Sequence, residues 1–104
     1  MIGTVELEKK IRDQVYEFFS DECGVDISEL NDDTDIISDI EGDSLMFLQL
    51  LESWKKEYNL NIEFRVIGKY MTKNPANTIG KAIDLALLII NDREKFLSLV
   101  EQQG

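Results

Sequence analysis

The residues best placed to do chemistry are Asp43 and Ser44, in the stretch Gly42-Asp43-Ser44-Leu45. They put a carboxylate beside a hydroxyl where an acidic segment ends and an amphipathic helix is predicted to begin. The chain has no histidine and one cysteine, so a serine hydrolase would lack its usual base. We therefore interpret Ser44 as an attachment point for another group, and we expect the protein not to be an enzyme.

The acidic segment before Ser44 holds the whole net charge of the chain. Between Asp21 and Asp43 there are ten Asp or Glu residues and no Lys or Arg, and the total charge is −10. Nucleic acid is disfavoured as a partner, because neutralising phosphates requires Lys and Arg. A basic protein surface is favoured, because a patch of one sign steers complementary partners. A plain solubilising role for this segment stays open.

Length and composition indicate one domain over residues 1–104. The N-terminus has no apolar run of the signal-peptide type, and the longest apolar run, residues 85–90, is too short to cross a membrane. Cys23 stands alone, which excludes a disulfide framework within the chain. We expect a cytoplasmic monomer without a transmembrane segment.

The strongest predicted helix spans residues 43–58. Asp43 can cap the free amides of its first turn, and a carboxylate suits the positive end of the helix dipole. Helical spacing puts five residues on one face, which we expect to be core: Phe47, Leu50, Leu51, Trp54 and Tyr58. Three further apolar residues, Leu45, Met46 and Leu48, lie off this face beside Ser44 and are interpreted as a docking surface. Ordinary surface hydrophobicity is the alternative.

A first helix is predicted over residues 4–22, with Gly24 as its stop. Residues 25–42 lack periodicity, and we expect an ordered loop whose aliphatic side chains are pinned to the bundle. The predicted apolar stripe of the first helix is Leu7, Ile11, Val15 and Phe18, and the loop aliphatics are Val25, Ile27, Leu30, Ile36, Ile37 and Ile40.

The second half of the chain predicts a short helix within residues 64–71, broken by Pro75, and a long one from residue 76. The long helix should be buried on more than one side, and Asn91-Asp92 should interrupt it. The predicted class is all-α: three long helices and one short helix form a core over about residues 4–91, and a helical extension covers about 92–104. The stripe of the long helix is Ile79, Ile83, Ala86 and Ile90, widened by Leu85, Leu88 and Ile89.

The acyl carrier proteins share an attachment motif, D-x-G-x-D-S-L, that resembles Asp39-Ile40-Glu41-Gly42-Asp43-Ser44-Leu45. The order of a first helix, a long loop and a serine opening the second helix is also similar to that family. A later segment, Thr78-Ile79-Gly80-Lys81-Ala82-Ile83-Asp84, resembles the start of the family's last helix. The resemblance covers roughly residues 5–90 and implies an acyl-carrier-like four-helix bundle.

The resemblance implies that a separate phosphopantetheinyl transferase esterifies Ser44 with 4′-phosphopantetheine from coenzyme A. Asp43 would help that transferase to hold its metal ion. The arm would then carry acyl groups as thioesters to partner enzymes of fatty-acid or related specialised acyl biosynthesis.

The chain also departs from the family pattern. Glu41 stands where the motif has glycine, and the exposed face of the second helix carries Lys55 and Lys56 where acids are usual. These departures favour a specialised carrier over a housekeeping one. The residues expected to contact partners are Asp39, Glu41, Leu45, Met46, Leu48 and Gln49.

Two other functions stay open: a small helical adaptor without a prosthetic group, and an aminoacyl or peptidyl carrier of the same fold. A calcium loop beginning at Asp39 is excluded, because its sixth position is Ser44 rather than glycine and its twelfth is Leu50 rather than glutamate. No metal site is expected.

Overall fold

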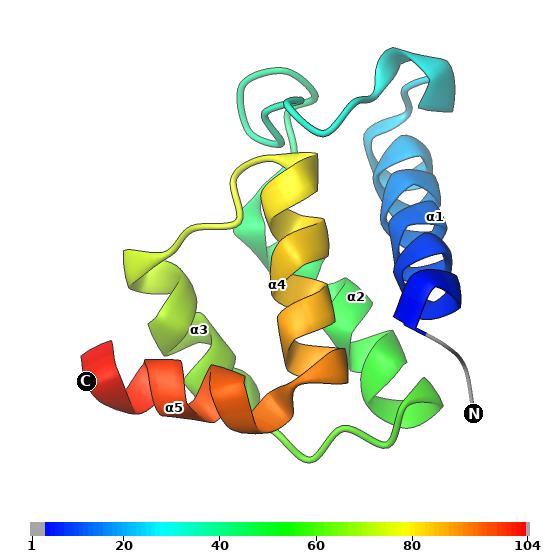
Figure 1. Cartoon of the computed structure of the whole chain (residues 1–104). Helices are drawn as coiled ribbons and strands as arrows, with labels where there is room; N and C mark the ends of the chain where they lie inside the picture. Colours follow the sequence, from blue (N-terminus) through cyan, green and yellow to red (C-terminus); the bar gives the residue numbers. More distant parts are fainter. Residues whose placement is uncertain (1–3, 104) are drawn as a thin grey trace.

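The computed structural model describes residues 4–103, and every regular element in that range is helical. The elements are α1 (Thr4–Cys23), the short 3₁₀-helix η1 (Ile27–Glu29), α2 (Ser44–Glu57), α3 (Phe64–Lys73), α4 (Ile79–Asn91) and α5 (Arg93–Gln103). In Figure 1, α4 runs through the centre, with α1 on one side, α3 on the other and α5 across the lower end. The predicted all-α class is confirmed, and the C-terminal extension is a fifth α-helix.

The central helix α4 is buried on more than one side, as predicted, because α1 and α5 both pack against it. It begins at Ile79 rather than at residue 76. The Thr78 hydroxyl accepts a hydrogen bond from the Lys81 N–H at 3.1 Å, which satisfies one of the free amides at this end. Its buried residues are Ile79, Ala82, Ile83, Leu85, Ala86 and Ile89.

The core stripe of α1 differs from the prediction at both ends, because Leu7, like Phe18, is only partly buried. Ile11, Val15 and Phe19 are fully buried, whereas the predicted Phe18 is only partly buried. The three buried residues follow a spacing of four, and the Phe18 ring packs edge-on against that of Phe19 at 5.2 Å. The predicted stop is confirmed: Gly24 has φ of +66°, in the left-handed region.

The helix α2 spans Ser44–Glu57, as predicted, and the N-cap and C-cap residues are Asp43 and Tyr58. The expected core face is confirmed for its first four members and holds partly for Tyr58, which is half-buried. The four buried residues are Phe47, Leu50, Leu51 and Trp54.

The last helix α5 packs against α3 and α4 through Phe96, which is fully buried. The ring of Phe96 lies 5.1 Å from that of Tyr70 on α3. The predicted interruption is confirmed, because Asp92 ends α4 and its carbonyl accepts the Phe96 N–H at 3.1 Å. The C-terminal extension is therefore part of the folded bundle, packed against α3 and α4.

Candidate functional site

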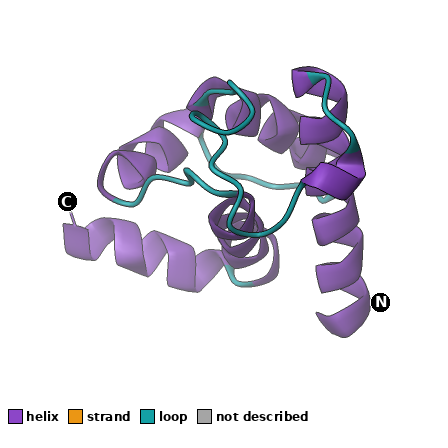
Figure 2. Ribbon diagram, turned by 90° about the horizontal axis from the view of Figure 1, so that it is seen from above, coloured by secondary structure: helices purple, strands orange, loops and turns teal. Residues whose placement is uncertain are grey.

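The long connection between α1 and α2 is ordered by hydrogen bonds to the chain just before and within the start of α4. Seen from above, these loops cross over one end of the bundle (Figure 2). The prediction of an ordered loop is confirmed. Three backbone bonds make the connection: Ile36 N–H to the Asn77 carbonyl at 2.9 Å, Ile79 N–H to Thr34 at 3.1 Å and Gly80 N–H to Asp32 at 2.8 Å.

Not all of the loop aliphatics are pinned to the core. Leu30, Ile36 and Ile40 are buried, as predicted. Ile27 and Ile37 are 45% and 58% exposed, so the prediction is wrong for these two. Ile27 lies in the exposed turn η1, and the backbone N–H of Ile37 is bonded to the Asp35 side chain at the protein surface.

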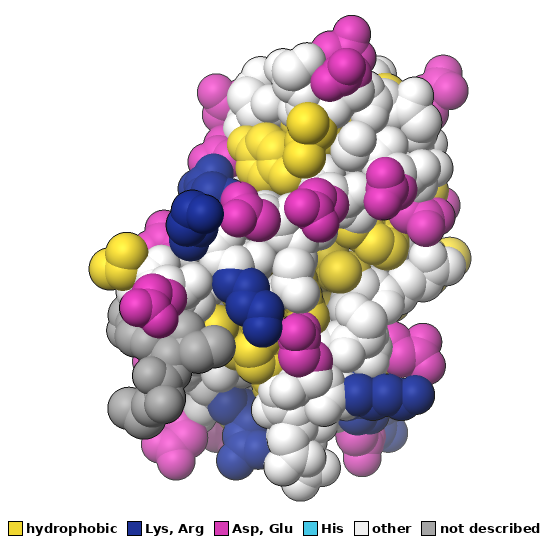
Figure 3. Space-filling view, turned by 90° about the vertical axis from the view of Figure 1, so that its right-hand side faces the viewer, with side chains coloured by type: hydrophobic (Ala, Val, Ile, Leu, Met, Phe, Trp, Pro, Cys, Tyr) yellow, Lys and Arg dark blue, Asp and Glu magenta, His cyan; other side chains and the backbone are white. Residues whose placement is uncertain are grey.

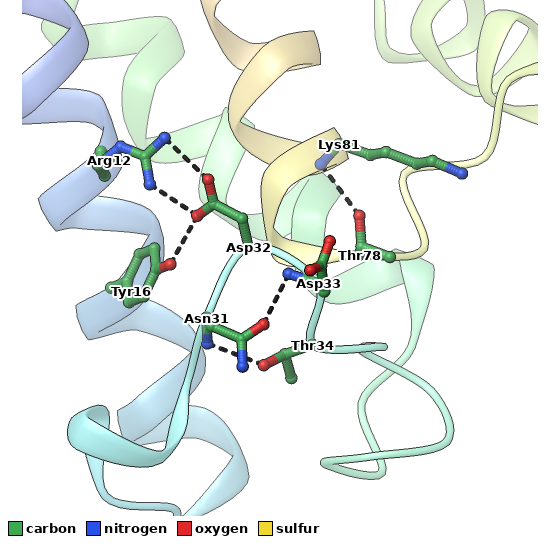
Figure 4. A network of polar contacts seen from close by, with 8 residues as sticks. All are labelled: Arg12, Tyr16, Asn31, Asp32, Asp33, Thr34, Thr78 and Lys81. Atoms are coloured by element: carbon green, nitrogen blue, oxygen red, sulfur yellow. Dashed lines mark hydrogen bonds and ion pairs between the residues drawn. The ribbon is translucent and has the colours of Figure 1, made fainter.

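A polar cluster ties the loop to α1, and the sequence analysis missed it (Figure 4). The Arg12 guanidinium donates to both carboxylate oxygens of Asp32 at 2.6 and 3.0 Å, and the Tyr16 hydroxyl donates to the same carboxylate at 2.6 Å. Arg12 and then Tyr16 lower the pKa of Asp32, while burial and then the Asp32 hydrogen bond raise the pKa of Tyr16 to about 12. Gly80 allows the loop to approach α4 closely here, because a Cβ on it would lie 3.0 Å from the Asp32 carbonyl oxygen.

The Asp32 cluster should make the stability of the protein depend on pH. Its folded-state pKa is lowered, so its contribution is complete above the ordinary pKa of an Asp, 3.8, and is lost as pH falls through the folded value. We expect Asp32→Asn to lower the free energy of unfolding by about 1 kcal/mol at pH 7, since the ion pair is partly exposed. Urea unfolding at pH 7 and pH 3 measures both effects. A loss no larger than that of the exposed neighbour control, Asp33→Asn, would contradict the role of this cluster.

The acidic residues just before Ser44 give the loop its negative charge, and their carboxylates also accept hydrogen bonds from its backbone. The Asp35 carboxylate accepts the N–H groups of Ile37 and Ser38 at 2.9 Å each, and the bond from the Ser38 backbone is the main cause that lowers the pKa of Asp35. The Asp39 carboxylate accepts the Asp35 N–H at 2.8 Å. Asp39 is exposed, so it can face a partner while it also holds this turn.

The shifted glycine of the motif has a structural reason. Gly42 is buried, its N–H donates to the Ile36 carbonyl at 2.6 Å, and a Cβ on it would lie 2.8 Å from Ile36 Cγ2. Glu41, at the usual glycine position, has φ of 58°, which side chains other than glycine seldom adopt. The loop therefore needs glycine at 42 for space and would favour it at 41 for conformation.

We expect opposite effects from changing these two neighbours. Gly42→Ala should destabilise the protein by about 1–3 kcal/mol, because the added methyl group would press on Ile36. Glu41→Gly should stabilise it by about 0.5–1 kcal/mol, because relief of the left-handed strain exceeds the entropy that glycine loses on folding. Urea unfolding of both variants checks this pair, and a Gly42→Ala protein as stable as the wild type would contradict the close contact.

The beginning of α2 presents Ser44 between two exposed residues. Asp43 caps the helix as predicted, because its carboxylate accepts the Met46 N–H at 3.2 Å. Ser44 is the first helical residue, and the side chain of Leu45 after it is 65% exposed. The structure thus places the carboxylate and the serine at the free end of one helix.

The predicted docking residues differ in exposure. Leu45 and Gln49 are exposed, whereas Met46 and Leu48 are half-buried and pack against the core. The Met46 sulfur lies 3.9 Å from the Cys23 sulfur at the end of α1, and burial is the first cause that raises the pKa of this thiol. The apolar surface at 45, 46 and 48 is therefore exposed only in part, because Met46 and Leu48 pack against the core.

A cavity of about 230 Å³ opens one helical turn beyond Ser44, at Leu48. Residues four apart lie on one face of a helix, so Ser44 and Leu48 are positions on the same face of α2. Ile36 and Ile37 contribute the loop side of the cavity. Its apolar lining is Ile36, Ile37, Leu48, Met71, Pro75 and Ala76.

The excess of negative charge lies at the loop end of the molecule. In Figure 3 the charged side chains at the top of the face are all Asp or Glu, while Lys and Arg lie lower down. Within residues 4–103 no group of three or more His, Cys, Asp or Glu is arranged to hold a metal ion. No helix in that range is long and apolar enough to cross a membrane.

Comparison with known proteins agrees with this geometry. The family described as "Phosphopantetheine attachment site" matches residues 13–80, which include the whole loop, α2, α3 and the first two residues of α4. The chain is also similar to an "Acyl carrier protein homolog" of Clostridium acetobutylicum, with 52% identity over 86 residues, covering 83% of this chain and 84% of that protein. The match supports a covalently bound 4′-phosphopantetheine. The chain belongs to the acyl carrier protein family.

Proposed function

We propose that Ser44 is the residue that carries 4′-phosphopantetheine. The observation that carries this proposal is its position: it opens α2 directly after a capped and hydrogen-bonded acidic loop, and exposed residues flank it. The free amides at a helix N-terminus also favour a phosphate, since they lie at the positive end of the helix dipole. Asp43 has two roles in this proposal, capping α2 and assisting the transferase.

The cavity next to Leu48 supports an acyl cargo. It lies along α2 from Ser44, and its walls are mainly aliphatic, which suits a hydrocarbon chain. Burial there would remove the chain from water and protect its thioester. We therefore propose a cytoplasmic carrier of acyl intermediates for fatty-acid or related specialised biosynthesis, without catalytic activity of its own.

Partner enzymes would approach the acidic loop end. Asp39 and Glu41 are exposed there and can steer a basic surface, an attraction that salt screens beyond about 10 Å at 0.1 M. Leu45 and Gln49 supply the exposed contact on α2, while the half-buried Met46 and Leu48 contribute only their accessible edges. Leu45 is therefore the apolar residue that we expect to matter most for docking.

The docking role can be tested by Leu45→Asp. Burying one leucine against a partner contributes about 1.5–3 kcal/mol, so we expect the affinity for a phosphopantetheinyl transferase to fall about tenfold or more. The free energy of unfolding should stay within about 0.5 kcal/mol of the wild type, since the side chain is exposed. The matched control is Leu97→Asp, at an exposed leucine on α5. If Leu45→Asp and Leu97→Asp bind the transferase with equal affinity, Leu45 has no special role in docking.

The proposed function is tested by incubating the protein with coenzyme A and a broad-specificity transferase, followed by intact mass spectrometry. A carrier gains the mass of one phosphopantetheine, whereas an adaptor without a prosthetic group gains none. Identifying the thioester on protein isolated from its own cells then separates an acyl carrier from an aminoacyl or peptidyl carrier.

A further inference from the structure

Gly68 is the one glycine among residues 4–103 whose presence the fold does not explain. Gly24 has a positive φ, and a Cβ on Gly42 or Gly80 would lie 3.0 Å or less from a neighbouring atom. Gly68 lies in the middle of α3 without a positive φ, and a Cβ on it would meet no atom within 4 Å. Glycine inside a helix is destabilising relative to alanine, so the fold alone would favour alanine at this position.

The side-chain position of Gly68 belongs to the cavity beside Leu48. Gly68 lines this cavity of about 230 Å³ together with two other residues of α3, Met71 and Thr72, which follow three and four positions later. Residues spaced by three and four share one face of a helix, so a side chain at 68 would stand on the face that α3 turns to the cavity. The absence of a side chain at 68 therefore leaves this part of the cavity open.

The cavity is accessible from the surface. Its lining residues Ile37 and Thr72 are exposed and belong to its rim, whereas Met71 is 8% exposed and belongs to its floor. Gly68 is half-buried, between these two levels. The Thr72 hydroxyl donates to the Gly68 carbonyl at 3.0 Å, so this polar group of the rim is satisfied within α3. An alkyl chain can thus pass position 68 without displacing a side chain or leaving this hydroxyl unpaired.

We propose that Gly68 is a specificity-determining residue, which sets the length of the acyl chain that the cavity can shelter. The proposal rests on the proposed function, because the chain arrives on the arm carried by Ser44. Each side-chain carbon added at 68 would take the place of a carbon of the cargo. Burying one methylene shifts the equilibrium between sheltered and exposed cargo about fourfold. Gly68 therefore favours an alkyl chain of several carbons over a short acyl group.

The test loads the whole protein with acetyl or octanoyl cargo from the matching acyl-coenzyme A. Intact mass follows cleavage of the thioester by hydroxylamine, and each rate is divided by that of the matching free pantetheine thioester. The wild type should protect the octanoyl thioester about tenfold or more better than the acetyl one, since several methylenes are buried. Gly68→Ala should lower the octanoyl protection about fourfold, and Gly68→Leu should reduce it to the acetyl level.

Stability distinguishes this role from a structural one. Gly68→Ala should raise the midpoint of thermal unfolding by about 2–8 °C, because alanine is the better helix residue and its methyl group meets no neighbour. Stability and octanoyl protection should thus change in opposite directions, which damage to the fold cannot produce. The matched control is Lys69→Leu, at an exposed residue of α3 outside the cavity lining, and it should protect octanoyl cargo as the wild type does.

A second readout is the side-chain methyl resonance of Met71. It should shift between acetyl- and octanoyl-loaded wild type, and Gly68→Leu should abolish this shift. Unchanged octanoyl protection in both Gly68 variants, or an equal loss in Lys69→Leu, overturns the role of Gly68, although the carrier function stands. A Gly68→Ala protein less stable than the wild type also overturns it, because the fold would then require the glycine. A wild type that takes up no phosphopantetheine from coenzyme A overturns the proposed function itself, before any cargo is compared.

Discussion

Trp54→Ala should lower the free energy of unfolding by about 3–5 kcal/mol, the range for truncating a large buried aromatic residue. The Trp54 side chain is 1% exposed, and its indole N–H donates to Gln14 Oε1 on α1 at 2.9 Å. The change would open a cavity between α1 and α2 and leave the Gln14 oxygen without this donor. A domain of this size typically has about 5–15 kcal/mol in total, so the variant should unfold at a temperature at least roughly 12 °C lower.

Two further variants serve as controls, one for the contribution of the buried ring and one for a substitution at the surface of α2. Trp54→Phe keeps most of the buried ring and should cost clearly less than the alanine variant. Glu52→Ala, at an exposed position of the same helix, should stay within about 0.5 kcal/mol of the wild type. Thermal and urea unfolding measure all three. A Trp54→Ala protein with an unchanged midpoint would mean that this face of α2 does not form the core.

The helices could be predicted from the sequence because each buries one apolar stripe. The spacing of Phe47, Leu50 and Trp54 specifies a single face of α2, and the structure buries that face. The apolar pattern does not distinguish Phe18 from Phe19, because two adjacent aromatic residues are one step of about 100° apart around the helix and either can continue the stripe. In the folded protein Phe19 is the fully buried member of the pair.

The loop and the cavity could be predicted only in part, because their contacts join residues distant in the sequence. No periodic pattern connects Arg12 to Asp32, or Asp32 to Gly80, although these contacts hold the loop that precedes Ser44. In contrast, the motif around Ser44 could be recognised in the sequence, because helix capping and the attachment motif both involve residues that are neighbours in the chain.

The central claim is that Ser44 alone receives the phosphopantetheine. The direct measurement is the intact mass of wild-type and Ser44→Ala proteins after incubation with coenzyme A and a broad-specificity transferase. The matched control is Ser38→Ala, at the nearest serine before Ser44 in the loop that precedes α2. Circular dichroism and thermal unfolding would show that each variant keeps the helical fold.

We predict that the wild type and Ser38→Ala each gain the mass of one phosphopantetheine, and that Ser44→Ala gains none while remaining folded. Peptide mapping should place the added mass on Ser44. Modification of a folded Ser44→Ala protein, or a wild type that is never modified, would contradict the account.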